Sequence, residues 1–456
     1  MTYRIEKDLI GTLKISDDDY YGINTERASR NFKLQTKKTD LDFIKQVARI
    51  KKAAATANEK VGRLSQKKAE AIRLAVTDIL ADKLDNQFII TEIQGGAGTS
   101  TNMNVNEVIT NRALEILGHK KGEYQYLSPL DDVNAGQSTN DVYPSAGKLT
   151  TLIKTNKLTL SVATLIDVLL EKSEEFAHVQ KMGRTQLQEA VPTTLGNSFK
   201  AFASGLTRCL DQVQKATQQL EILNMGGTAI GTGVNTSDGY DEILYSELKK
   251  DYGRNIRQAE DLLDATQNLD SYVLFSGSLK ALAVMLSKMS HDLRLLSSGP
   301  KSGFNEIELP AQQAGSSIMP GKVNPVIPEI ASQAAFEVIG NDATITFAAE
   351  SGELELNAFE PVIFHNLFES VDFLNSACAM MATECVKGIQ ANVKECADDV
   401  KNSAETVTDL TPVIGYEAAC DAVKKSLKTG VDVYRILKDE GIYDRDAEVG
   451  DLDRAQ

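Results

Sequence analysis

Five long stretches of helical periodicity constrain the fold of this 456-residue chain more than any other feature of its sequence. Apolar residues recur every three or four positions within each stretch, which is the spacing of an amphipathic α-helix. A helix of about 30 residues is about 45 Å long, so the pattern predicts a mainly α protein built around a long helical bundle. The stretches cover residues 140–179, 193–223, 265–296, 327–350 and 358–388.

The bundle divides the chain into three predicted domains. Residues 1–139 combine short alternating segments with helical periodicity, as at 41–60, so we expect a mixed but mostly helical N-terminal domain. Residues 140–390 form the predicted bundle. Residues 391–456 have shorter patterns and more charge, and we expect a small C-terminal helical domain there. The stretch 265–296 is apolar on more than one face, which indicates helices buried against neighbours, including other subunits.

Charge and cysteine usage limit the partners and the compartment. The chain has 49 Lys and Arg against 64 Asp and Glu, a net charge of −15, which disfavours nucleic acid and anionic membranes as partners. We find neither an N-terminal signal segment nor an apolar run long enough to span a membrane. The five cysteines form no C-x-x-C pair. We therefore expect a cytoplasmic protein with reduced thiols, no cofactor and no obligatory metal.

The segment GSSIMPGKVNP, residues 315–325, is the first candidate for a functional site. Its glycines and prolines predict a loop, and loops on rigid scaffolds often carry catalytic groups. Lys322 offers a compact cation and Asn324 offers amide donors for an anionic substrate. Ser316 or Ser317 could act as a base if its alkoxide were stabilised. The alternative is an ordinary surface turn that contains a lysine.

Three further polar clusters occur at residues 96–104, 137–141 and 183–188, and each is predicted to join a loop to the start of a helix. Unpaired N–H groups and the positive end of the helix dipole favour a carboxylate at such a position. Each cluster alone is also typical of an ordinary helix cap. Together with the loop at 315–325, they predict a cradle for a small dicarboxylate.

These four segments resemble the signature blocks of the aspartase/fumarase superfamily, and the resemblance covers almost the whole chain. It implies a largely helical three-domain fold and a homotetramer in which each active site draws its clusters from three subunits. It also implies that Ser316 is the catalytic base on a mobile loop. The residues implied to bind substrate are Thr99, Ser138, Thr139, Asn140, Thr185, Gln186, Lys322 and Asn324.

Within the superfamily, several blocks are similar to the aspartase branch. These blocks are QGGAGTS at 94–100, GEYQYL at 122–127 and KMGRTQ at 181–186, where fumarases usually carry histidine in place of Gln186. The resemblance implies reversible deamination of L-aspartate to fumarate and ammonia. Expulsion of hydroxide from malate needs a proton donor, usually histidine, whereas ammonia leaves without further protonation.

Two alternatives remain open at the level of sequence. The first is a fumarate hydratase, which the block around His365 resembles more closely. The second is a catalytically inactive relative that serves as a structural protein, like the lens crystallins of this superfamily. Leu130 and Asp132 also depart from the asparagine and histidine that relatives often carry, so a secondary carboxylate site is expected to differ.

Overall fold

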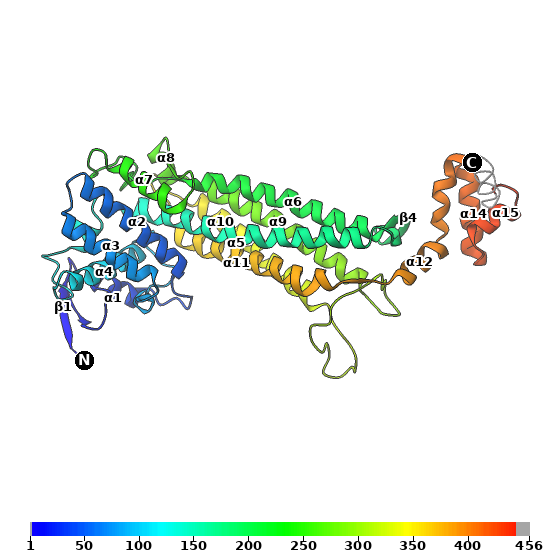
Figure 1. Cartoon of the computed structure of the whole chain (residues 1–456), viewed down its shortest axis with the longest axis horizontal. Coiled ribbons are helices and arrows are strands. Elements are labelled where there is room, and N and C mark those ends of the chain that lie inside the picture. The colour runs from blue at the N-terminus through cyan, green and yellow to red at the C-terminus, as the bar shows by residue number, and fades with distance from the viewer. Residues whose placement is uncertain (1, 444–456) are drawn as a thin grey trace. The chain divides into compact units, whose positions relative to one another are not determined.

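The computed structural model describes residues 2–443 and is mainly helical (Figure 1). The mainly α fold class predicted from the sequence is therefore confirmed. Strands are short and form four two-stranded pairs within the described residues. Three pairs are antiparallel, and β5 (Ile222–Leu223) pairs in parallel with β6 (Arg257–Gln258).

The remaining strands and the helices have the following bounds. The strands are β1 (Tyr3–Lys7), β2 (Thr12–Ser16), β3 (Gln180–Thr185), β4 (Gln188–Thr194), β7 (Ile307–Glu308) and β8 (Gln390–Ala391). The helices up to the bundle's third long helix are α1 (Ile23–Asn31), α2 (Leu41–Lys60), α3 (Gln66–Leu80), α4 (Thr99–Ile116), α5 (Thr139–Glu175), α6 (Leu195–Thr217), α7 (Tyr240–Tyr252), α8 (Leu262–Gln267) and α9 (Asp270–Leu296). The later helices are α10 (Val326–Glu350), α11 (Glu360–Met380), α12 (Val393–Asn402), α13 (Thr411–Ile414), α14 (Tyr416–Thr429) and α15 (Val433–Asp439).

Residue contacts divide the described chain into two compact units, and α5, α6, α9, α10 and α11 each contribute residues to both. The division into three domains stays a prediction, and residues 444–456 of its last domain lie outside the described residues. The first unit holds residues 2–160, 209–284 and 333–376, and the second holds residues 161–208, 285–332 and 377–443.

A cluster of aromatic rings joins four helices of the first unit. The ring of Phe43 on α2 meets the ring of Tyr143 edge-on at 4.9 Å between centroids. Phe364 on α11 stacks with Phe368 at 5.7 Å and meets Tyr272 edge-on at 5.3 Å. Such pairs contribute beyond their buried area, so the cluster ties α2, α5, α9 and α11 together.

Polar caps fix where the N-terminal helices begin. The Asp40 carboxylate accepts the N–H groups of Asp42 and Phe43 at the start of α2. The buried Glu107 carboxylate accepts the N–H groups of Gly22 and Thr25 where α1 begins. Each cap satisfies donors that the first turn of a helix leaves unpaired. Helices α2, α3 and α4 then pack side by side, as Figure 1 shows.

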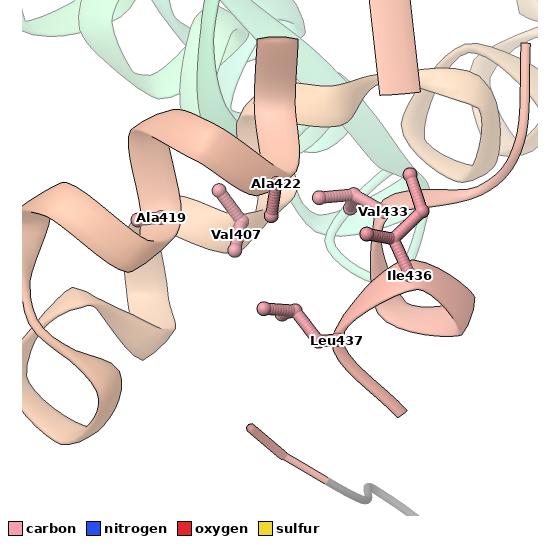
Figure 2. Packing of buried hydrophobic residues seen from close by; sticks show 6 residues of the cluster. All are labelled: Val407, Ala419, Ala422, Val433, Ile436 and Leu437. Atoms are coloured by element: carbon pink, nitrogen blue, oxygen red, sulfur yellow. The ribbon is translucent and has the colours of Figure 1, made fainter. Parts of the chain in front are cut away.

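The C-terminal helices of the second unit have a small core of their own. Figure 2 shows its six buried residues, which come from the 3₁₀ segment Ala404–Leu410, α14 and α15 and face one another. Partly buried Leu410, Ile414 and Tyr434 pack against them. This cluster agrees with the expectation of short helices after residue 391.

The structure shortens or divides three of the predicted long helices. The stretch 265–296 is two helices, because Asn268 has an extended backbone at the end of α8 and α9 begins only at Asp270. Asn and Asp favour such boundaries because their side chains compete for backbone hydrogen bonds. The stretch 193–223 is α-helical only to Thr217, before a 3₁₀ turn, and 358–388 is α-helical only to Met380, before a π-helical turn.

One described helix, α9, is long and apolar enough by length and composition alone to cross a membrane. Its most apolar window is 56% buried within the protein. The core helix of a globular protein passes the same test, so the finding is weak support for a membrane span.

Gly147 on α5 lies against the ring of Phe364, and a Cβ atom there would come within 1.9 Å of the ring. We therefore expect Gly147→Ala to destabilise the protein by about 1–3 kcal/mol through overpacking. The usual effect of this change inside a helix is a gain of about 1 kcal/mol. Denaturant unfolding measures the difference. Addition of Phe364→Leu should restore part of the loss, and an unchanged or raised stability of G147A alone would contradict the packing described.

Candidate active site

The first unit brings two of the predicted clusters into contact. Asn102 on α4 donates its side-chain N–H to the Thr139 hydroxyl at 3.2 Å, and Thr139 is the first residue of α5. Thr99 begins α4, after Gly98 with φ of +84°. A Cβ on Gly98 would come within 2.3 Å of the Tyr143 ring, so glycine is required there. Thr99 is exposed and Thr139 is buried.

The Oδ1 atom of Asn134 joins these clusters to α2. It accepts the ammonium of Lys51 at 2.8 Å, the amide of Asn106 at 3.1 Å and the amide of Asn102 at 3.2 Å. We call these residues, together with Thr139, the Asn134 network. Lys51 is fully buried, and this burial lowers its pKa to about 7, while the charge of Asp141 raises it in part.

The second cluster caps α5 and also holds a distant loop. The Ser138 hydroxyl accepts the N–H of Asn140 at 3.2 Å, and the Asp141 carboxylate accepts the N–H of Ser138 at 2.9 Å. Asp141 also accepts the N–H of Thr228 at 3.0 Å, and the Asn140 amide donates to the Ala229 carbonyl at 2.7 Å. Burial raises the pKa of Asp141 to about 6, against these backbone hydrogen bonds.

The third cluster is a β-hairpin, so the expectation that residues 183–188 begin a helix is wrong. Thr185 ends β3 and Gln188 begins β4, with Gln186 and Leu187 between them as a two-residue turn. Both turn residues have positive φ, +54° and +63°, which is costly for side chains of this kind. Thr185 and Gln186 are exposed at this turn. A sharp hairpin presents the two side chains where a helix start was expected.

The loop predicted to carry the base lies between β7 and α10 in the second unit. The Ser316 hydroxyl oxygen accepts the N–H of Ile318 at 3.1 Å and the N–H of Met319 at 2.8 Å. Two aligned backbone donors would favour the oxygen when it is negatively charged. A serine can act as a base only if its alkoxide is stabilised, and these two N–H groups are donors of the kind that could do so.

The same loop closes on itself next to Ser316. The N–H of Gly315 donates to the Lys322 carbonyl, and the Asn324 amide donates to the Gly315 carbonyl, both at 2.8 Å. A Cβ on Gly315 would meet the Lys322 carbonyl oxygen at 2.6 Å. Lys322 is exposed and forms no ion pair with a described residue. Lys322 and Asn324 border a cavity of about 720 Å³ in the second unit.

Sequence reasoning missed Lys51 and Asn134. Lys51 lies in an amphipathic helix next to another lysine, and Asn134 lies in a loop, so neither position carries a local signal of function. Their contact spans 83 residues of sequence. Leu130 and Asp132 are the two positions at which the sequence departs from the residues that relatives often carry. The Leu130 side chain is 57% exposed, and the Asp132 carboxylate lies 2.8 Å from the Lys68 ammonium.

The arrangement suits binding of a small anion and proton transfer from carbon. Neutral hydrogen-bond donors and the lysines Lys51, which is buried, and Lys322, which is exposed, favour the binding of carboxylates. The hydrogen-bonded oxygen of Ser316 favours base catalysis. The described residues contain no group of three or more His, Cys, Asp and Glu that could hold a metal ion. Thr99, Ser138, Thr139 and Asn140 lie in the first unit, and Thr185, Gln186, Ser316, Lys322 and Asn324 lie in the second.

Comparison with known proteins decides the family. A family model described as lyase matches residues 11–340. The chain is 49% identical to an aspartate ammonia-lyase of Pseudomonas aeruginosa over 98% of this chain and 95% of the relative. It is 50% identical to one of Helicobacter pylori over 97% of this chain and 95% of the relative. The chain belongs to the aspartase/fumarase superfamily.

Solved structures of this superfamily share the fold. Fumarate lyase:delta crystallin from Brucella melitensis, bound to cobalt, matches with a TM-score of 0.95 and 47% identity over 98% of this chain and 97% of that chain. Class II fumarase from Schistosoma mansoni matches with a TM-score of 0.93 and 35% identity over 97% of this chain and 96% of that chain. The superfamily predicted from the sequence blocks is thus confirmed.

Lys51 predicts how dicarboxylate binding depends on pH. The pKa values of about 7 for Lys51 and about 6 for Asp141 mean that the pair turns net negative as pH rises through 7. A unit charge roughly 10 Å from a ligand contributes about 1.7 kcal/mol at an effective dielectric constant of about 20. We therefore expect the Kd for succinate, measured by calorimetry, to rise by roughly 10- to 20-fold between pH 6 and 9.

The variant Lys51→Met should bind succinate more weakly than the wild type at pH 6 and show a smaller rise of Kd up to pH 9, because only Asp141 then titrates. Lys52→Met is the matched control, since that side chain is only half-buried and lies 3.9 Å from Asp251. Equal slopes of Kd against pH in K51M and the wild type would contradict a role of the Lys51 charge.

Proposed function

We propose that this chain catalyses the reversible deamination of L-aspartate to fumarate and ammonia. The observation that carries the proposal is the Ser316 hydroxyl, which accepts two backbone N–H groups beside Lys322 and Asn324. The curated relatives support it, because proteins named aspartate ammonia-lyase match at 43–50% identity over nearly the whole chain. The chain is then a carbon–nitrogen lyase.

The first chemical step is removal of a proton from Cβ of L-aspartate by Ser316. The C–H electron pair moves into the adjacent carboxylate, which becomes an enediolate with two negative charges, and the proton stays on the serine oxygen. Fixed donors must stabilise this new charge. We assign that role to Lys322 and Asn324 of the loop together with hydroxyl and amide groups of the three other clusters. The latter belong to Thr99, Ser138, Thr139, Asn140 and Thr185.

The second step is the expulsion of ammonia from Cα. The electron pair of the enediolate forms the double bond of fumarate, and the C–N bond pair leaves with the nitrogen as neutral ammonia. No acid is needed to protonate this leaving group. Gln186, at the hairpin turn, is uncharged and cannot act as an acid, which is compatible with its assignment as a substrate-binding residue. A hydratase would need a proton donor for hydroxide.

The second candidate function is fumarate hydratase, and the match to a class II fumarase of known structure favours it. That match is 35% identical, below the values for the named ammonia-lyases. His365, in the block that resembles fumarases, lies 3.1 Å from Glu92, and this contact raises the pKa of the histidine. A histidine held in that ion pair has a structural explanation.

We also propose that the enzyme is a homotetramer whose three-domain chains share a central bundle and complete one another's active sites. Large apolar side chains of the first unit support this assembly: Leu274, Val284 and Phe347 are 59%, 53% and 70% exposed. Exposed apolar groups on long helices are typical of a surface covered by another subunit. Small dicarboxylates are its partners in this proposal, without nucleic acid or membrane.

The five cysteines support a cytoplasmic location. None of the five, all of which lie among the described residues, is assigned to a disulfide, and three of them, Cys378, Cys385 and Cys396, are buried. Free thiols persist in reducing compartments. Burial raises the pKa of Cys378 and Cys385 to about 12, which keeps both protonated and unreactive.

The catalytic role of Ser316 is tested by Ser316→Ala with L-aspartate and L-malate offered separately. Fumarate absorbance should rise with L-aspartate and not with L-malate in the wild type, and kcat should fall by about 10²–10⁴ in the variant. Circular dichroism checks the fold. Ser317→Ala, which changes the neighbouring hydroxyl, should keep kcat close to the wild-type value.

Three results of this assay would refute parts of the proposal. A normal kcat in S316A would refute the assigned base. Faster turnover of L-malate than of L-aspartate would favour the hydratase. No turnover of either substrate would favour a structural protein.

The shared bundle predicts that assembly and activity are lost together. Phe347→Asp places a charge in the proposed interface, so we expect the mass by light scattering to fall from about 200 kDa, four times 49.6 kDa, and kcat to fall with it. Leu427→Asp is the control, because Leu427 is 75% exposed on α14 outside the bundle. A fully active monomeric F347D would contradict the shared site.

A further inference from the structure

Glu306 is a carboxylate with no exposed side-chain surface, and it lies between two cations. Its Oε1 atom accepts a hydrogen bond from Arg184, and its Oε2 atom lies 3.0 Å from the Lys181 ammonium. The exposed fractions of the Lys181 and Arg184 side chains are only 6% and 16%. An ion buried this deeply costs several kcal/mol, and its partners repay that only with good geometry.

The backbone of Glu306 connects two further segments. Its N–H donates to the carbonyl of Leu296 at the end of α9 at 2.8 Å, and its carbonyl accepts the N–H of Asn392 at 2.9 Å. The next two residues form β7, which pairs with β8 directly before Asn392. The loop that carries Ser316 begins shortly after Glu306. Through its backbone, Glu306 therefore attaches the base of this loop to the segment that leads into α12.

Arg184 links the same carboxylate to α12. Its second guanidinium nitrogen, Nη2, lies 2.9 Å from the Asp399 carboxylate, and its guanidinium carbon lies 4.4 Å from the centre of the Phe304 ring. A planar guanidinium can bind two carboxylates and stack on a ring at once, which a lysine cannot do. Arg184 directly precedes Thr185 and Gln186 in the hairpin.

Arg184 shares the fixing of the hairpin with a contact of β4, in which the Ser403 hydroxyl donates to the Glu189 carboxylate at 2.5 Å. The register of the hairpin shifts between Met182 and Arg184, a bulge that turns the strand, and its tip is exposed with two positive φ angles. A Cβ at Gly183 would come within 2.6 Å of the Val191 carbonyl oxygen, so the bulge is tight. Because Arg184 directly precedes Thr185 at this bulge, the way in which Arg184 is held contributes to the direction of Thr185.

We infer that Glu306 and Arg184 are positioning residues that hold Thr185 and Gln186 in the orientation needed to bind substrate, with the base of the Ser316 loop fixed to the same carboxylate. This inference rests on the proposed function for the identity of the substrate. Neither residue contacts the reacting atoms. A buried ion pair is a poor source of net stability, so geometric specificity is the better explanation of this one.

The test uses Arg184→Lys, Glu306→Gln and the control Asp342→Asn in the full-length enzyme. Asp342 is 8% exposed at its side chain and pairs with Lys280 in the first unit, so D342N also removes a largely buried charge. We expect R184K and E306Q to raise KM for L-aspartate about tenfold at a temperature well below unfolding, since small misplacements of binding groups are costly. D342N should lower Tm and leave KM unchanged.

Hydrogen exchange of the 180–194 hairpin provides a readout that is independent of activity. Exchange should be faster in R184K than in the wild type or D342N. If E306Q fails to fold, R184K alone decides. A wild-type KM and wild-type exchange in R184K would overturn the inference. If the wild type does not convert L-aspartate, the proposed function fails, and faster exchange in R184K would still support the anchoring of the hairpin.

Discussion

The side-chain carbonyl of Asn134 receives three N–H donors from two helices, and the polar corner of the first unit depends on this convergence. A carbonyl oxygen has two lone pairs, so the three N–H donors must share these two acceptor sites. Lys51 is fully buried there, which a lysine tolerates only with such an acceptor and a depressed pKa. These contacts fix the position of the start of α4, and the hydrogen bond from Asn102 to Thr139 joins it to the start of α5.

The candidate residues of the second unit lie on a hairpin turn and a loop instead of at the starts of helices. The hairpin turn and the loop with Ser316 have exposed tips, and each is held by contacts at its base. Gly315 and Asn324 close the loop, and Arg184 with Glu306 holds the hairpin. Rigid bases with exposed tips suit segments that must meet a substrate and release its product.

Local patterns in the sequence were enough to predict that long helices dominate the fold, although not all of their ends, and that Ser316 lies in a loop. Helical spacing is a repeated local signal, and the residues around Ser316 combine glycine, proline and polar groups in one short segment. The hairpin was mispredicted because Gln186 and Leu187 lack the Asn-Gly or Asp-Gly pattern that marks two-residue turns. Lys51, Asn134 and Glu306 were missed because contacts far apart in sequence give them their importance.

We propose that one small diacid meets the donors of all four clusters, supplied by neighbouring copies of the chain. A crystal structure of the S316A variant soaked in L-aspartate tests it most directly. The account predicts carboxylate oxygens within hydrogen-bond distance of Thr99, Ser138 or Thr139 and also of Thr185, Lys322 and Asn324, with Cβ facing residue 316. L-Aspartate bound elsewhere, or in contact with only one of the clusters, would contradict the account.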